Sequence, residues 1–72
     1  MELKDKRVVV VGFGRTGQAV CDFLLSQGAN ITVSDKKPEA ELERVEIYRA
    51  KGVNFDTGAN RLETLLQAEL VV

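Results

Sequence analysis

The chain has 72 residues, which is enough for one small domain and no more. Hydrophobic residues make up 44% and charged residues 29% of the composition, as in an ordinary globular protein. The net charge of −1 favours neither nucleic acid nor an anionic membrane as a partner. A single cysteine, Cys21, excludes an internal disulfide and is typical of a reducing compartment. We therefore expect a cytoplasmic protein that binds neither nucleic acid nor membranes.

The first elements expected along the chain are a strand, a glycine turn and a helix. Residues 7–11 (RVVVV) are apolar and β-branched after the arginine, which is typical of a strand covered on both faces. A helix is expected from Gly14 or Arg15 to Gln27, with Gly28 as its left-handed cap. Helical spacing predicts that its buried face consists of Ala19, Val20, Phe23 and Leu24.

The remaining elements continue the alternation of strands and helices. A strand over residues 31–34 ends at Asp35, and a helix is expected from Glu39 to Lys51, with Pro38 in its first turn. A weak strand follows over residues 53–56. A short helix is expected from Asn60, an N-cap residue, to Leu66, and the last strand begins at Leu70.

This alternation predicts an α/β fold, a three-layer Rossmann-like parallel sheet with right-handed crossovers. Residues 1–72 form one domain in this interpretation. The final "ELVV" ends within an apparent central strand. We therefore expect a truncated fragment of a larger multidomain protein, incomplete at its C-terminal end.

Gly12, Gly14 and Gly17 form a G-x-G-x-x-G pattern between the first strand and the first helix. In dinucleotide-binding domains the first glycine permits the tight turn, the second lets a phosphate approach the backbone, and the third allows close packing of helix and sheet. The free N–H groups of the helix start then favour an anion. The alternative interpretation is a tight turn that holds no ligand.

Five polar residues share the carboxyl edge of the expected sheet with this turn. Asp35 is placed to accept hydrogen bonds from ribose hydroxyls. Alternatively, it is a turn aspartate that hydrogen-bonds its own backbone. Lys36 and Lys37 are placed to contact a phosphate or a ligand ring; alternatively, they are solvated lysines of the turn. Arg15 opposes the helix dipole unless a phosphate binds there, and Thr16 fits a phosphate contact or a cap. The sequence contains no histidine and no recognisable catalytic or metal-binding set.

The segments "GFGRTG", "LLSQGA", "ITVSDKKP" and "RLETLLQAELVV" give the chain a broader resemblance. Over essentially all 72 residues it resembles the N-terminal domain of the Mur ligases, in particular their D-glutamate-adding members. The alternative that the glycine pattern alone leaves open is an NAD(P)-binding Rossmann domain of a dehydrogenase or of a ligand-gated regulatory protein.

The resemblance implies that the ligand is the UDP part of UDP-N-acetylmuramoyl-L-alanine. Gly14, Arg15, Thr16 and Gly17 are then expected at the diphosphate and uridine region, and Asp35, Lys36 and Lys37 around the uracil. It also implies an ATP-dependent ligase of peptidoglycan synthesis, in which D-glutamate attacks an acyl phosphate with Mg²⁺ present. The sites for ATP, metal and D-glutamate belong to later domains in that family. We therefore expect no catalytic residue, metal ligand or bound cofactor in this segment itself.

Overall fold

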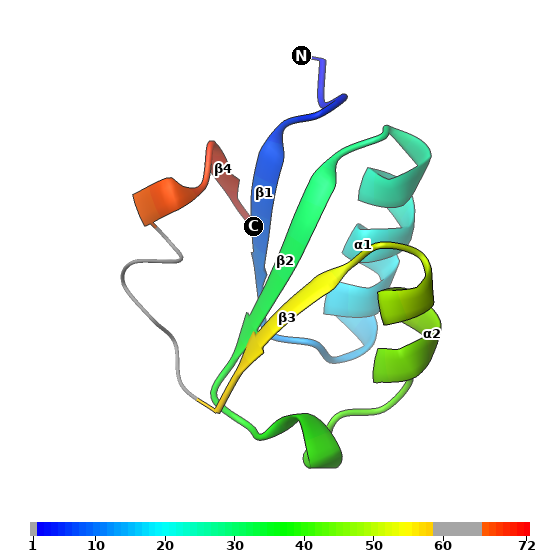
Figure 1. The fold of residues 1–72 in the computed structure, drawn as a ribbon, viewed down its shortest axis with the longest axis vertical. Coiled ribbons are helices and arrows are strands. Elements are labelled where there is room, and N and C mark those ends of the chain that lie inside the picture. The colour runs from blue at the N-terminus through cyan, green and yellow to red at the C-terminus, as the bar shows by residue number, and fades with distance from the viewer. Residues whose placement is uncertain (1, 59–65) are drawn as a thin grey trace.

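The computed structural model describes residues 2–58 and 66–72 (Figure 1). Its strands are β1 (Arg7–Val11), β2 (Asn30–Asp35), β3 (Asn54–Thr57) and β4 (Leu70–Val71). They form one sheet in the order β3-β2-β1-β4, and every pairing is parallel. This order confirms the predicted α/β, Rossmann-like fold. The helix expected from Asn60 to Leu66 falls almost entirely outside the described residues.

The register of β1 and β2 places their large apolar side chains in one layer. Val8 pairs with Ile31, and Val10 pairs with Val33. All four side chains are at most 2% exposed and belong to a single core cluster. Alternate residues of a strand point to the same face, so this layer faces the helices. The valine-rich segment is thus the centre of the core, as its composition predicts.

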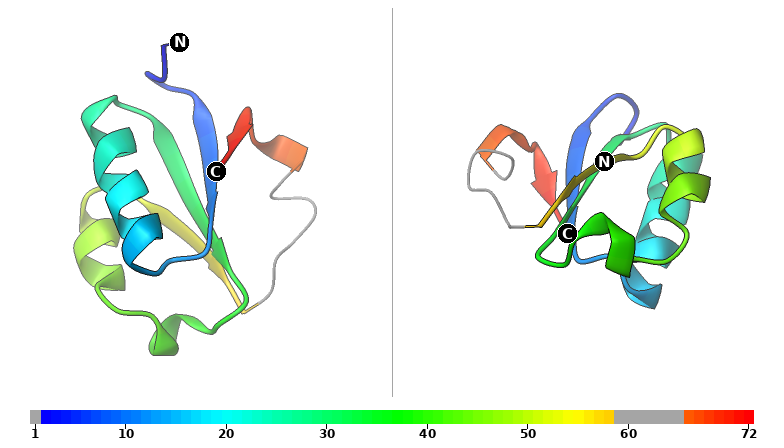
Figure 2. Two further views of the ribbon diagram at one scale, coloured as in Figure 1. Left: turned by 180° about the vertical axis from the view of Figure 1, so that it is seen from behind. Right: turned by 60° about the horizontal axis from the view of Figure 1, so that its bottom comes forward.

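Two helices, α1 (Arg15–Ser26) and α2 (Val45–Ala50), cover the same face of the sheet (Figures 1 and 2). Right-handed crossovers from β1 to β2 and from β2 to β3 run in the same direction, so both helices lie on one side. The chain then returns past β1 to β4, which reverses the direction. No helix within the described residues is long and apolar enough to cross a membrane.

The predicted apolar face of α1 is partly wrong. Leu24 is buried, but Phe23 is 58% exposed and Ala19 is exposed. The side facing the sheet instead contains Cys21, which has no exposed surface. Gly17, Cys21 and Leu24 lie one turn apart, and the absence of a side chain at Gly17 lets this line approach the sheet. Gly28 has a φ of 74°, which confirms it as the left-handed cap.

The single helix predicted from Glu39 to Lys51 is also wrong. The structure has a short 3₁₀ helix (Glu39–Glu41), an extended Leu42 and then α2. Arg44 precedes α2 with a φ of 64°, a left-handed conformation that breaks the helix. The break lets Leu42 pack against the core together with Val45 and Tyr48, three apolar residues that share no clean stripe on one helix.

Glu69 joins the start of β4 to the start of β1. Its Oε2 accepts a hydrogen bond from the backbone N–H of Arg7 at 2.9 Å, and its own N–H donates to the Arg7 carbonyl at 2.8 Å. The Nζ of Lys6 lies 3.7 Å from Oε1. The Arg7 N–H and, secondarily, the charges of Lys6 and Arg7 lower the pKa of Glu69 from its usual range.

Glu69→Gln tests this junction through the pH dependence of stability. A lowered folded-state pKa means that the carboxylate stabilises the fold above its unfolded pKa, and that this contribution is lost as pH falls through the folded pKa. We expect the free energy of unfolding of the wild type to exceed that of the variant at pH 7. The difference should shrink towards zero below about pH 4. Urea unfolding across this range measures it, and a pH-independent difference would contradict the role of the charge.

Candidate functional site

The glycine turn lies at the carboxyl end of β1, next to the end of β4. Gly12 has a φ of 91°, a left-handed conformation that an L side chain rarely adopts. Its N–H donates to the carbonyl of Ser34 at 2.8 Å, while Val11 N–H donates to Val72 at 2.9 Å. The turn therefore leaves the sheet between β2 and β4, where the strand order reverses. Open α/β sheets bind their ligands at such a switch point.

Gly17 and Gly14 meet different surroundings. A Cβ on Gly17 would lie 2.3 Å from the carbonyl oxygen of Gly12, so only glycine lets α1 start this close to the turn. A Cβ on Gly14 would meet no described atom within 4 Å. Gly14 is therefore not required by packing within the described residues, and its backbone faces open space. Packing thus accounts for Gly17 and leaves room for a ligand at Gly14.

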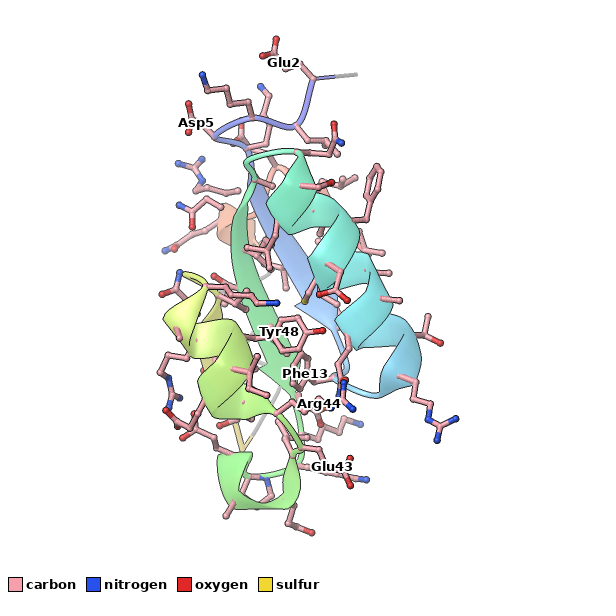
Figure 3. All side chains as sticks on the ribbon, turned by 90° about the vertical axis from the view of Figure 1, so that its right-hand side faces the viewer. Glu2, Asp5, Phe13, Glu43, Arg44 and Tyr48 are labelled. Carbon is pink, nitrogen blue, oxygen red and sulfur yellow. The ribbon has the colours of Figure 1, made fainter. Side chains whose placement is uncertain are left out.

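Phe13 anchors the turn, and the sequence interpretation did not identify it. Its side chain is 3% exposed and makes edge-to-face contacts with Tyr48 of α2 and Phe55 of β3, at centroid distances of 5.3 and 5.0 Å. Figure 3 shows Phe13 and Tyr48 close together between the two helices. The sequence did contain a signal for this anchor: an aromatic residue lies between two turn glycines, and a loop that faces only solvent does not need an aromatic residue.

Asp35 connects this turn to the loop after β2. Its Oδ2 accepts a hydrogen bond from the Phe13 N–H at 2.8 Å, and its Oδ1 accepts one from the Lys37 N–H at 2.9 Å. The second bond is the local turn that the sequence offered as one alternative. The first bond, between residues far apart in the chain, could not be read from the pattern. The carboxylate thus accepts hydrogen bonds from two backbone N–H groups at once.

The start of α1 is open to solvent. Within the described residues, no side chain caps Gly14 and the first turn of α1 contains no acidic residue. Arg15 and Thr16 are both exposed. Uncapped N–H groups, the positive end of the helix dipole and an exposed guanidinium all favour an anion at this position.

Two hollows flank the glycine turn and meet at Arg15. One, of about 320 Å³, lies towards β4 and is lined by residues that include Gly14, Thr16, Gly17 and Val72. The other, of about 310 Å³, lies towards β2 and is lined by residues that include Phe13, Asp35 and Lys37. The structure therefore gathers six of the seven predicted site residues around one turn. Lys36, the seventh, is exposed in the adjacent loop and lines neither hollow.

Reactive groups do not gather at this site. The thiol of Cys21 is buried, and burial, together with the charge of Asp22, raises its pKa to about 11. It is therefore protonated at neutral pH and is a poor nucleophile. The described residues contain no group of three or more His, Cys, Asp or Glu side chains placed to hold a metal ion. Within the described residues, the uncapped start of α1 and the exposed Arg15 beside it are the features of this turn that favour an anion.

Comparisons with known proteins show which family the chain resembles. The family model described as Mur ligase MurD-like, N-terminal domain, matches residues 6–72. The chain is 42% identical to the UDP-N-acetylmuramoylalanine–D-glutamate ligase of Desulfatibacillum aliphaticivorans and 41% identical to that of Koribacter versatilis. Each alignment covers 100% of this chain and 16% of the relative, so the chain spans about a sixth of the length of these ligases.

The fold is also similar to that of an enzyme with a different name. SirC, a precorrin-2 dehydrogenase, matches with a TM-score of 0.79 and 29% sequence identity. That match covers 99% of this chain and 35% of the dehydrogenase. The fold of this chain therefore also occurs in a protein named as a dehydrogenase.

The variants Gly17→Ala and Gly14→Ala test at which of the two positions packing requires glycine. The added methyl at position 17 would clash with the Gly12 carbonyl, so we expect a loss of about 1–3 kcal/mol in the free energy of unfolding. The same change at position 14 meets open space at a φ of −89°, so stability should remain within about 0.5 kcal/mol of the wild type. Denaturant unfolding measures both. Equal losses for the two variants would show that α1 does not start against Gly12.

Proposed function

The chain belongs to the Mur ligase family as a MurD-like N-terminal domain, and on this basis we propose that it binds the UDP part of UDP-N-acetylmuramoyl-L-alanine. The observation that carries the proposal is the uncapped start of α1 at Gly14, beside the exposed Arg15. A diphosphate is the part of this substrate that such a helix start favours. The names of the relatives supply the rest of the substrate.

The diphosphate end of the proposed site consists of Gly14, Arg15, Thr16 and Gly17. A cation in the first turn of a helix costs about 0.3–1 kcal/mol against the helix dipole. A bound diphosphate turns that cost into attraction for Arg15. Thr16, the next residue, is exposed, and its hydroxyl can donate to a phosphate oxygen. Gly14 keeps the approach to the backbone clear because no Cβ projects there.

The uridine end of the proposed site lies towards β2, where Asp35, Lys36 and Lys37 form the loop. Arg15 lines the hollows on both sides of the turn, so a ligand at the helix start can extend from one to the other. Lys37 lines the second hollow and offers an alkyl stem and an ammonium group to a flat base or a ribose. This arrangement supports a nucleoside on the β2 side of the diphosphate.

The whole protein, in this proposal, is a cytoplasmic ligase that joins D-glutamate to the alanyl carboxyl group in peptidoglycan synthesis, and so serves cell-wall formation and division. It would use ATP and Mg²⁺. In that family the sites for ATP, Mg²⁺ and D-glutamate belong to later domains, and we assign them to other parts of the ligase here too. The role of this chain is to hold the substrate by its nucleotide.

A nicotinamide dinucleotide is the second candidate ligand. The specific observation in its favour is the likeness to SirC, whose name identifies a dehydrogenase. The glycine turn fits the pyrophosphate of either ligand, and Asp35 lies where a ribose hydroxyl is bound in many dinucleotide domains. The match of the family model over residues 6–72 favours the uridine nucleotide.

Isothermal titration of the full-length protein with UDP-N-acetylmuramoyl-L-alanine, and separately with NAD, tests the proposal. We expect saturable binding of the UDP compound and none of NAD at the same concentrations. Gly14→Val should weaken binding of the UDP compound roughly tenfold to a hundredfold, because a branched side chain blocks charge-assisted bonds from the turn.

The matched control is the unfolding transition of Gly14→Val, which must show that the variant is folded; since valine is a poorer N-cap than glycine, we expect a modest loss of stability. Lys4→Gln removes a charge at the opposite edge of the sheet and should leave affinity unchanged. Saturable NAD binding without binding of the UDP compound would refute the proposal. Unchanged affinity in a folded Gly14→Val variant would refute the placement of the diphosphate.

A further inference from the structure

The two hollows beside the glycine turn differ in charge. Among the described residues, the hollow towards β4 is lined by one charged side chain, that of Arg15. The hollow towards β2 is lined by three carboxylates, those of Asp35, Glu41 and Glu43, and by two cations, Arg15 and Lys37. Carboxylates therefore outnumber cations on the β2 side, although Arg15 lines both hollows.

The segment before α2 places Glu41 and Glu43 at the β2-side hollow. Leu42 lies between them, packs against the core and lines the same hollow, so it fixes the backbone of its two neighbours. The short 3₁₀ helix that ends at Glu41 adds two backbone bonds. Glu41 N–H donates to the Pro38 carbonyl at 2.9 Å, and Leu42 N–H donates to the Glu39 carbonyl at 3.0 Å. Both carboxylates are thus presented by a segment whose backbone is held in place.

Neither of these two carboxylates is neutralised by an ion pair. Both side chains are exposed, and neither pairs with a cation in the part of the chain that the structure describes. Two nearby glutamates differ in this respect, because Glu39 and Glu46 both pair with Arg49. Arg44 lines a neighbouring hollow between α1 and α2 rather than this one. The β2-side hollow therefore has two uncompensated negative charges at its edge.

We propose, on the basis of the proposed function, that Glu41 and Glu43 are specificity-determining residues that keep phosphate groups out of the β2 side of the site. A phosphate on the ribose would add about two negative charges beside these carboxylates, and like charges repel. A neutral uracil and an unphosphorylated ribose meet no such repulsion. The ligand class is therefore a nucleoside diphosphate whose ribose carries no further phosphate and whose diphosphate lies on the β4 side.

The test is isothermal titration of the full-length protein with UDP and with UDP that carries a further phosphate on its 2′-hydroxyl. We expect the wild type to bind the 2′-phosphorylated ligand about tenfold more weakly than UDP. The double variant Glu41→Gln/Glu43→Gln keeps the size of both side chains and removes their charge. In this variant the ratio of the two dissociation constants should fall roughly threefold to tenfold, with little change in the affinity for UDP itself.

The matched control is the double variant Glu2→Gln/Asp5→Asn, which removes the same charge at the opposite end of the molecule from Glu43 (Figure 3). It should leave the ratio unchanged, because the repulsion is local. A second measurement uses only the wild type. Raising the ionic strength from about 0.1 M to about 1 M shortens the screening length from about 10 Å to about 3 Å, so the ratio should fall towards that of the Glu41→Gln/Glu43→Gln variant. A purely steric preference would not respond to salt in this way.

Several results would overturn the inference while UDP still binds. Equal affinity of the wild type for the two ligands, or an unchanged ratio in the double variant, would show that these carboxylates do not repel the added phosphate. Weaker binding of both ligands by a folded double variant would show that the carboxylates accept hydrogen bonds from the ligand instead. Much stronger binding of UDP itself would place the diphosphate on the β2 side. A wild type that binds neither ligand would refute the proposed function, and the inference with it.

Discussion

The immobilised peptide of Phe13 is the constraint on which the glycine turn depends. Its ring is buried against Tyr48 and Phe55, while its N–H is bound by Asp35. Edge-to-face aromatic pairs contribute about 0.5–1.5 kcal/mol each beyond the area they bury. The turn is thereby joined to α2, β3 and the loop after β2. A loop fixed in this way can present the backbone N–H groups of α1 to a ligand without a large entropic cost of ordering.

The topology explains why the site lies at this turn. Two crossovers place α1 and α2 on one face of the sheet, and the chain then returns past β1 to β4. The loop after β1 leaves the sheet beside this reversal, and a Cβ at Gly14 would meet no described atom within 4 Å. At the opposite edge, Glu69 joins β4 to β1 by binding the backbone of Arg7.

Much of this arrangement could be predicted from local sequence because it follows from single residues or short patterns. The apolar run before Gly12 predicts β1, and steric limits at Gly12 and Gly17 predict the turn. The break before α2, with a left-handed Arg44 and Leu42 packed against the core, could not be predicted because tertiary contacts override local helix propensity. The bond from Asp35 to Phe13 joins distant segments, so no periodicity reveals it. Which nucleotide binds was suggested only by resemblance to a family.

The central claim is that the start of α1 holds a uridine diphosphate. The most direct measurement is a map of amide chemical-shift changes as UDP is added to ¹⁵N-labelled protein. A site at the glycine turn predicts saturable shifts in Gly14 to Gly17 and in Lys36 and Lys37, with residues 4–7 at the opposite edge unchanged. Saturable shifts confined to that opposite edge, or none at Gly14 to Gly17 at saturating UDP, would contradict it.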